Sequence, residues 1–230
     1  MSITQPAQPG PSARPAWLER VMEEIEREQP TAFETFAPPV DPERRSAVLM
    51  LFGPTGDGGT DVVLTARSRD LRAHPGQVSF PGGRVDPTDA GPVEAALREA
   101  HEEVGIEPAS VDVVGQMPPL FLTPSGNAVT PVLGWWPRPG AVRVVDPAEV
   151  AQVERVPLAE LLDPARRFTV VHPSGYSGPG FEASGLFVWG FTALLLGAVL
   201  DLAGLAQPWD AGVERPIPEH VLSDWTRNRG

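Results

Sequence analysis

The sequence predicts an α+β domain built on a mixed sheet, and three observations lead to this fold class. Strand-like apolar runs outnumber helical patterns along the 230 residues. The helical patterns interrupt these runs and do not alternate with them, so a regular succession of strand and helix is not expected. No internal repeat is visible, and the length suits one domain of moderate size with extensions at its ends.

The first elements follow from composition and periodicity. Residues 1–14 are rich in Pro, Gln and Ser and are expected to form a disordered tail without the apolar run of a secretory signal. Residues 16–28 place apolar side chains on one helical face, so residues 15–42 are expected to hold an N-terminal helix and a linker. Residues 46–52 and 61–66 are typical of buried strands joined by a turn-rich loop.

The second half of the chain is expected to add more strands and two helices. Strand-like runs cover residues 111–116, 129–136, 141–145, 149–156 and 167–171. A short helix is expected at 157–162 and an apolar helix at about 190–204. The main domain is expected to span residues 43–206, which leaves 207–230 as a C-terminal extension.

Residues 183–200 carry no charge over eighteen positions, the lower limit for a membrane span. Gly185 and Gly190 interrupt this run, Asp201 follows at once, and no basic residue flanks either end. We therefore expect a buried strand-to-helix segment here.

The charge balance and the absence of cysteine exclude several classes of protein. Net charge is -12, and all 18 basic residues are arginine. Duplex binding needs a basic footprint and an anionic membrane repels this chain, so we expect neither a nucleic-acid partner nor a membrane. Without cysteine there are no disulfides, thiolate nucleophiles or Cys-based zinc sites, which fits a location in the cytoplasm.

A central helix is predicted over residues 92–104. Pro92 suits the first helical position, and Gly105 suits the position just beyond the end. Five apolar residues form one stripe that would pack on the sheet. They are Val93, Ala96, Leu97, Ala100 and Val104.

Three glutamates, Glu99, Glu102 and Glu103, stand at i, i+3 and i+4 of this helix, so their carboxylates are expected to converge on another face. Two carboxylates about 4 Å apart repel by about 1 kcal/mol in water and about 4 kcal/mol at an effective dielectric near 20. Arg98 can reach Glu102, but one guanidinium does not neutralise three carboxylates. A solvated acidic helix face is one interpretation, and a site for Mg²⁺, which takes oxygen ligands and shares substrate phosphates, is the other.

The stretch "GGRVDPTDAGPVEAALREAHEEVGI", residues 82–106, resembles the Nudix box. Its second half, "REAHEEVGI", matches the usual pattern fully. In the first half Asp89 stands where Glu is usual, and eight residues rather than seven separate it from Arg98. The same lengthening looks like the coenzyme A pyrophosphatase branch of the family.

A second motif, "LTARSRDLRAHPGQVSFPGG" at residues 64–83, is similar to the signature that precedes the box in that branch. The resemblance covers roughly residues 45–206 and implies a Nudix-like α/β/α sandwich with a mixed sheet. Arginine forks suit phosphate oxygens, so the basic residues near the box are candidate substrate-binding groups. They are Arg67, Arg69, Arg72, His74 and Arg84.

The resemblance also implies a reaction, the metal-dependent hydrolysis of coenzyme A to 4′-phosphopantetheine and 3′,5′-ADP, with Mg²⁺ or Mn²⁺ as cofactor. It implies Glu99 and Glu103 as metal ligands and Glu102 as a further ligand or the base for water. Arg98 would orient the carboxylates by ion pairing, so the expected catalytic residues are Glu102, Arg98 and Glu99. The expected partner is a small nucleotide, and a homodimer is allowed.

Three alternatives stay open at the level of sequence. The box supplies chemistry and not specificity, so another substrate such as ADP-ribose or a modified nucleotide is one of them. An enzyme of the isopentenyl diphosphate isomerase type is disfavoured, because it resembles enzymes with a catalytic cysteine. A non-catalytic nucleotide sensor is disfavoured because all three box glutamates are present.

Overall fold

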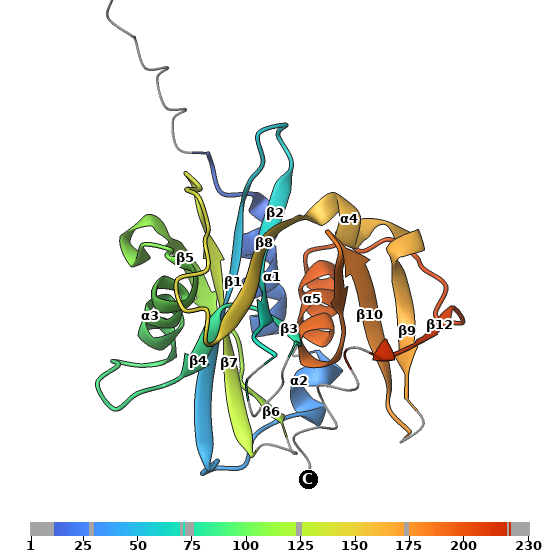
Figure 1. Ribbon diagram of the computed structural model, residues 1–230, viewed down its shortest axis with the longest axis horizontal. Coiled ribbons are helices and arrows are strands. Elements are labelled where there is room, and N and C mark those ends of the chain that lie inside the picture. Colours follow the sequence, from blue (N-terminus) through green and yellow to red (C-terminus); the bar gives the residue numbers. More distant parts are fainter. Residues whose placement is uncertain are drawn as a thin grey trace, which may run out of the picture.

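The computed structural model describes residues 12–27, 30–69, 71, 76–122, 126–172, 175–219 and 221. Its centre is a mixed eight-stranded sheet (Figure 1). The strand order is β3 (Val78–Ser79), β2 (Thr60–Arg67), β1 (Arg44–Pro54), β7 (Asn127–Trp135) and β5 (Asp112–Gln116). Three further strands pair with this path: β4 (Gly82–Arg84) with β1, β6 (Leu120–Leu122) with β7, and β8 (Val150–Pro157) with β2. β1 and β7 run parallel, and the other pairs are antiparallel.

Helices cover both faces of this sheet. α3 (Pro92–Val104) lies on one face, while α1 (Ala16–Arg27) and α5 (Gly190–Leu202) lie on the other (Figure 1). β1 shows why the strand runs are continuously apolar: Leu49 and Leu51 pack toward α3, and Met50 and Phe52 pack toward α1 and α5. The predicted α+β class with a mixed sheet and helices on its faces is confirmed.

A second sheet lies on the far side of α5 (Figure 1). It has four strands in the order β11 (Leu186–Val188), β10 (Ser177–Ala183), β9 (Arg167–Val171) and β12 (Glu214–Pro216). Short helical turns connect the remaining elements: α2 (Thr31–Thr35), η1 (Pro108–Ser110), α4 (Leu158–Leu162) and η3 (Pro164–Arg166). The sequence predicted the strand at 167–171 but not that it belongs to a separate sheet.

The strand predicted at 141–145 is wrong. This segment is extended but pairs with no strand, because its amides are used at the end of α3. Arg143 N–H donates to Val104 O (3.3 Å) and Val145 N–H donates to Glu103 O (2.9 Å). Val142 and Val144 pack on the same apolar cluster as α3. The apolar alternation that suggested a strand therefore serves to cap a helix.

The two ends of the chain contribute more than the sequence indicated. Residues 1–11 lie outside the described residues, but Ser12 is in contact: its N–H donates to Pro137 O (2.9 Å), and its O accepts from Trp135 Nε1 (3.1 Å). Within residues 207–230, β12 runs parallel to β9, and Ile217 is buried against the second sheet. In the described part of the chain, no helix is long and apolar enough to cross a membrane.

Candidate active site

The carboxylates of α3 are positioned by a helix with well-defined ends. Gly91 precedes the helix and its carbonyl accepts from Ala95 N–H (3.1 Å), with Pro92 at the first turn. Gly105 ends the helix in the left-handed conformation (φ 74°), and its N–H donates to His101 O (3.0 Å). The face carrying Ala95, Ala96, Ala100 and Val104 is buried against the sheet. Both predicted ends of this helix are confirmed.

Two glycines allow β4 to pass close to its neighbours. A Cβ on Gly82 would lie 2.3 Å from Ala47 O, so a larger residue would collide with the backbone of β1. A Cβ on Gly83 would lie 2.5 Å from Glu99 Oε1. The glycine pair therefore makes the space in which the Glu99 carboxylate lies.

Glu103 is the most buried carboxylate of the site, with 3% of its surface exposed. Its Oε2 accepts a hydrogen bond from Gly82 N–H (3.0 Å). Burial raises the pKa of Glu103 to about 7, opposed by the Gly82 amide and by the positive charge of Arg67. The nearby charges of Glu99 and Glu149 raise it further. A buried acid with a raised pKa and acidic neighbours is typical of a functional site.

Glu99 lies between this buried acid and the surface, with a side chain that is 15% exposed. Burial raises its pKa, and the ion pair with Arg98 (Nη1–Oε1 3.1 Å) opposes the rise. The charges of Glu102 and Glu149 act in the same direction as burial. Glu99 and Glu103 are therefore neighbouring carboxylates that both resist ionisation in the metal-free protein.

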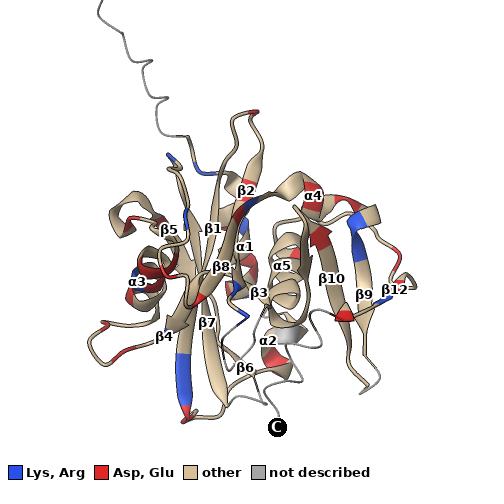
Figure 2. Cartoon of the chain, viewed as in Figure 1, with Lys and Arg blue, Asp and Glu red and all other residues tan. Residues whose placement is uncertain are grey.

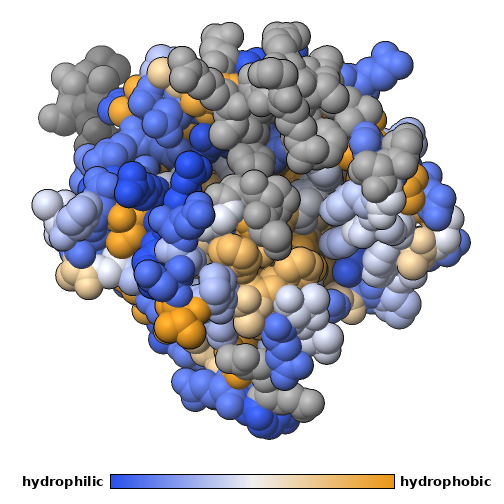
Figure 3. Space-filling model, turned by 90° about the horizontal axis from the view of Figure 1, so that it is seen from below, coloured by the Kyte–Doolittle hydropathy of each residue, from blue (hydrophilic) through white to orange (hydrophobic). Residues whose placement is uncertain are grey.

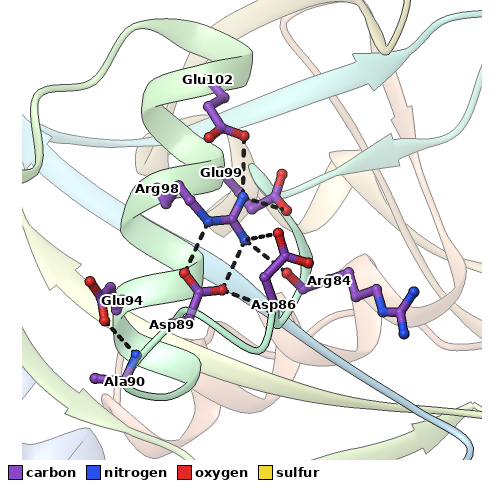
Figure 4. Close-up of polar contacts among 8 residues, drawn as sticks. All are labelled: Arg84, Asp86, Asp89, Ala90, Glu94, Arg98, Glu99 and Glu102. Atoms are coloured by element: carbon purple, nitrogen blue, oxygen red, sulfur yellow. Dashed lines mark hydrogen bonds and ion pairs between the residues drawn. The ribbon is translucent and has the colours of Figure 1, made fainter.

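Arg98 forms a hub between α3 and the preceding loop (Figure 4). It donates to both carboxylate oxygens of Asp89, from Nε (3.0 Å) and from Nη2 (2.9 Å), and to the carbonyl of Arg84 (3.0 Å). Nη1 donates to Glu102 Oε2 (3.2 Å). The guanidinium lowers the pKa of Asp89, and Asp89 in turn raises that of Arg98. Asp89 therefore anchors Arg98 and is not placed as a metal ligand.

The three box glutamates do not converge as the helical spacing suggested. Glu103 turns inward to Gly82, whereas the Glu102 side chain is 57% exposed and extends to Arg98. Within the described residues, no three acidic or histidine side chains are arranged to hold a metal ion. The donor set still fits a divalent cation, because Glu99 and Glu103 are hard oxygen donors whose charges repel each other. Figure 2 shows the acidic residues gathered on α3.

A cavity of about 280 Å³ adjoins the box glycines and is lined by residues of the central sheet, by Trp189 and by the first turn of α5. Gly82 and Gly83 form one side, and Trp189 and Phe191 form part of another. Arg67 also lines it and has a buried Nε without a hydrogen-bond partner among the described residues. Seen from below, apolar surface is visible in a recess near the middle of the molecule (Figure 3).

A β-bulge helps to place Arg67. The register between β2 and β8 shifts between Ala66 and Arg67, which changes the direction of the strand at that point. The bulge ends the regular pairing where the chain reaches the cavity, close enough to Glu103 for the positive charge to lower its pKa.

Arg69 and Arg84, two of the other predicted substrate-binding residues, do not line this cavity. Arg69 is exposed, and Arg84 is exposed with its guanidinium turned away from Arg98 (Figure 4). Arg72 and His74 lie outside the described residues. Of the five basic candidates, the structure brings Arg67 to the carboxylates.

Sequence reasoning missed Glu149, whose charge acts on both Glu99 and Glu103. Its carbonyl accepts from Ser68 N–H (2.8 Å), so it is held beside the arginine-rich segment. No motif marked it, because it is separated from the box by more than forty residues. Trp189 and Phe191 lie within the uncharged run 183–200, which was expected to be buried, but nothing indicated that they line the cavity.

The mixed sheet with helices on both faces, together with the glycine pair, the arginine hub and the acidic helix, defines a Nudix domain. A comparison with protein-family models agrees, since residues 42–173 match the NUDIX domain. The chain belongs to the Nudix family.

Named relatives give the same assignment. The uncharacterized Nudix hydrolase NudL of Escherichia coli K12 is 39% identical over 178 residues, covering 74% of this chain and 89% of that protein. NudL of Cronobacter sakazakii is 42% identical over 164 residues, covering 70% of this chain and 82% of the relative. Among solved structures, a NUDIX hydrolase from Alicyclobacillus acidocaldarius covers 71% of this chain and 93% of its own at 16% identity and a TM-score of 0.48. The protein is a Nudix hydrolase, an enzyme that acts on phosphorus anhydrides, and such enzymes generally use divalent metal ions.

Proposed function

We propose that the enzyme hydrolyses the pyrophosphate bond of coenzyme A or its derivatives to 4′-phosphopantetheine and 3′,5′-ADP, with Mg²⁺ or Mn²⁺. The observation that carries this proposal is the segment 64–83. It resembles the signature of the coenzyme A branch, and its two ends flank the carboxylates. Arg67 lines the cavity near one end, and Gly82 donates to Glu103 at the other.

In this proposal Glu99 and Glu103 hold the metal ion, with Glu102 as a further ligand or the base for the attacking water. When bound, the ion supplies charge neutralisation on the phosphate and a lower pKa for water. The Gly82 amide fixes the Glu103 carboxylate, and Arg98 keeps Glu99 and Glu102 oriented. Arg98 is thus a positioning residue, itself held by Asp89 on the opposite side.

The groups around the carboxylates suit the remaining parts of the substrate. Arg67 is half-buried in the cavity wall, and a guanidinium is a group that suits phosphate oxygens. The cavity wall formed by Phe80, Trp189 and Phe191 is apolar and suits an uncharged part of the molecule. Glu149 adds a fourth negative charge near the two metal-holding carboxylates.

The experiment is the specificity constant, kcat/KM, on coenzyme A, dephospho-coenzyme A and ADP-ribose at one fixed concentration of Mg²⁺. We expect coenzyme A to be cleaved fastest per unit concentration. If arginines hold the 3′-phosphate, dephospho-coenzyme A should be poorer by roughly 10- to 150-fold, the worth of one charge-assisted hydrogen bond.

Paired substitution of Arg69 and Arg72 by alanine should remove most of this difference and leave kcat unchanged. Arg138→Ala is the matched control, because Arg138 is exposed and outside the motif. Equal constants for coenzyme A and dephospho-coenzyme A would remove the role of the 3′-phosphate. A clear preference for ADP-ribose would overturn the coenzyme A assignment and leave the Nudix chemistry intact.

Location in the cytoplasm is a prediction of the same kind and follows from the absence of cysteine. A homodimer is allowed, but the sequence does not specify the oligomeric state. Fractionation of cells, and light scattering of the purified protein after gel filtration, test them directly.

A further inference from the structure

A second cavity, of about 600 Å³, opens along the C-terminal half of α5. Its walls come from α1, α5 and the second sheet, and it shares no lining residue with the catalytic cavity. Leu194, Ala198 and Leu202 give it an apolar side. Its volume lies within the range of cavities that hold small molecules.

Arg167, the first residue of β9, lines this cavity and is half-buried. Its Nε is buried and has no hydrogen-bond partner among the described residues. The guanidinium carbon lies 5.2 Å from the ring centre of Phe181 and 4.7 Å from that of Trp209. The two rings hold the cation by cation–π contact but accept none of its in-plane N–H bonds.

The charges around Arg167 only partly compensate it. Asp201 on α5 acts on it through space, and burial still lowers the pKa of Arg167. Glu24 and Arg20 of α1 also line the cavity, and Arg20 donates to Ala203 O (3.3 Å). The cavity lining therefore carries two arginines and two acidic side chains. Among the described residues, Arg167 has no ion-pair partner.

Gly197 of α5 lies against the guanidinium of Arg167. A Cβ at Gly197 would lie 3.3 Å from Arg167 Nη2, closer than ordinary contact. A glycine inside a helix costs about 0.5–1 kcal/mol relative to alanine. The half-buried Arg167 and the helix-interior Gly197 both lower the stability of the fold, and they lie next to each other. Residues that lower stability together in this way are typical of functional sites.

We propose that this cavity binds a small-molecule carboxylate with an apolar chain, its carboxylate on Arg167 and its chain along Leu194, Ala198 and Leu202. A carboxylate is the anion that pairs with a guanidinium through charge-assisted hydrogen bonds, and Arg167 makes no ion pair with the described residues. The negative charges of Glu24 and Asp201 select against a phosphate, which carries nearly two charges at neutral pH. The site lies on the opposite part of α5 from Phe191, and its assignment is independent of the proposed substrate.

The test uses the full-length protein and three probes: decanoate below its micellar concentration, decanol, and inorganic phosphate. Binding is measured by calorimetry and by methyl NMR spectra. We expect saturable binding of decanoate that shifts the methyl signals of Leu194 and Leu202 and not those of Leu122 and Val129, which line the catalytic cavity. Decanol and phosphate should each bind at least about 10-fold more weakly than decanoate. Decanol lacks the carboxylate that would pair with Arg167, and phosphate lacks the apolar chain.

Two variants test separately the charge of Arg167 and the volume of the cavity. Arg167→Met keeps an apolar side chain of similar length and should weaken decanoate binding at least about 10-fold. Arg166→Met is its matched control, because the neighbouring Arg166 points to Glu160 (3.1 Å) and should leave binding unchanged. Ala198→Leu fills the cavity without touching the guanidinium and should also abolish binding.

Five results would overturn the proposal: no saturable binding of decanoate, equal binding of decanol, equal or tighter binding of phosphate, unchanged binding in Arg167→Met, or unchanged binding in Ala198→Leu. If Arg167→Met fails to fold, Ala198→Leu decides the question alone, since unchanged binding there places the ligand elsewhere.

Discussion

Replacing Glu103 by glutamine should remove a pH dependence from the stability of the metal-free protein. In the unfolded chain this carboxyl has a pKa near 4.5, and in the folded protein burial raises it to about 7. Between these values the folded state binds more protons than the unfolded state, so the free energy of unfolding falls as pH rises from 4.5 to 7. Below 4.5 both states are protonated, and above 7 both are ionised.

The size of the effect follows from the shift. Each pKa unit is worth about 1.4 kcal/mol, so the wild-type protein should lose up to about 3 kcal/mol across this window through Glu103. Glutamine keeps the shape and one acceptor oxygen for the Gly82 amide but cannot ionise. The stability of Glu103→Gln relative to wild type should therefore increase by up to about 3 kcal/mol between pH 4.5 and pH 8.

The assay is urea unfolding in the presence of EDTA at several pH values, followed by tryptophan fluorescence and circular dichroism. Other carboxyls titrate in both proteins, so the difference between the two curves isolates Glu103. Glu26→Gln, at an exposed position of α1, is the control for replacing a carboxyl by an amide outside the site. Parallel curves for Glu103→Gln would refute the reasoning, because they would mean that Glu103 titrates normally. The variant should also lower turnover at least about 10²-fold, and near-normal turnover would exclude a catalytic role.

Three further changes test other contacts. Asp89→Asn should lower kcat with little change in KM, because it weakens the ion pair that holds Arg98; unchanged kcat would show that Arg98 needs no anchor. Gly83→Ala should raise the Mg²⁺ concentration needed for half-maximal activity several-fold without unfolding the protein. The reason is that the nearest atoms to the added Cβ are those of the Glu99 carboxylate. An unchanged metal titration would show that Glu99 is not a metal ligand. Deleting residues 1–11 should leave Tm unchanged, whereas deleting 1–14 should lower it through loss of the hydrogen bonds at Ser12; equal Tm values would contradict the packing of that residue.

Local patterns predicted the elements whose signals are local. The α3 helix carries its own start and end signals in Pro92 and Gly105, and the strands that are buried on both faces are apolar throughout. These features do not depend on distant parts of the chain. They were therefore readable from the sequence.

Features that depend on distant partners could not be predicted. The segment 141–145 has strand-like alternation, yet its amides bond to the end of α3 rather than to a strand. Helical spacing placed three glutamates on one face, but the inward turn of Glu103 depends on the Gly82 amide in β4. Glu149 reaches the site from a loop that no pattern connects to the box. In each case tertiary contact decided the outcome.

The cavity beside the box glycines takes its walls from the central sheet and from the start of α5. Gly82 and Gly83 belong to the central sheet, whereas Trp189 follows β11 directly and Phe191 lies in the first turn of α5. In the proposed function, the carboxylates that hold the metal ion and the apolar wall that meets the substrate therefore come from separate parts of the fold. On that proposal, a chimera that receives the second sheet and α5 of a related hydrolase is expected to change its preferred substrate and keep its own hydrolytic centre.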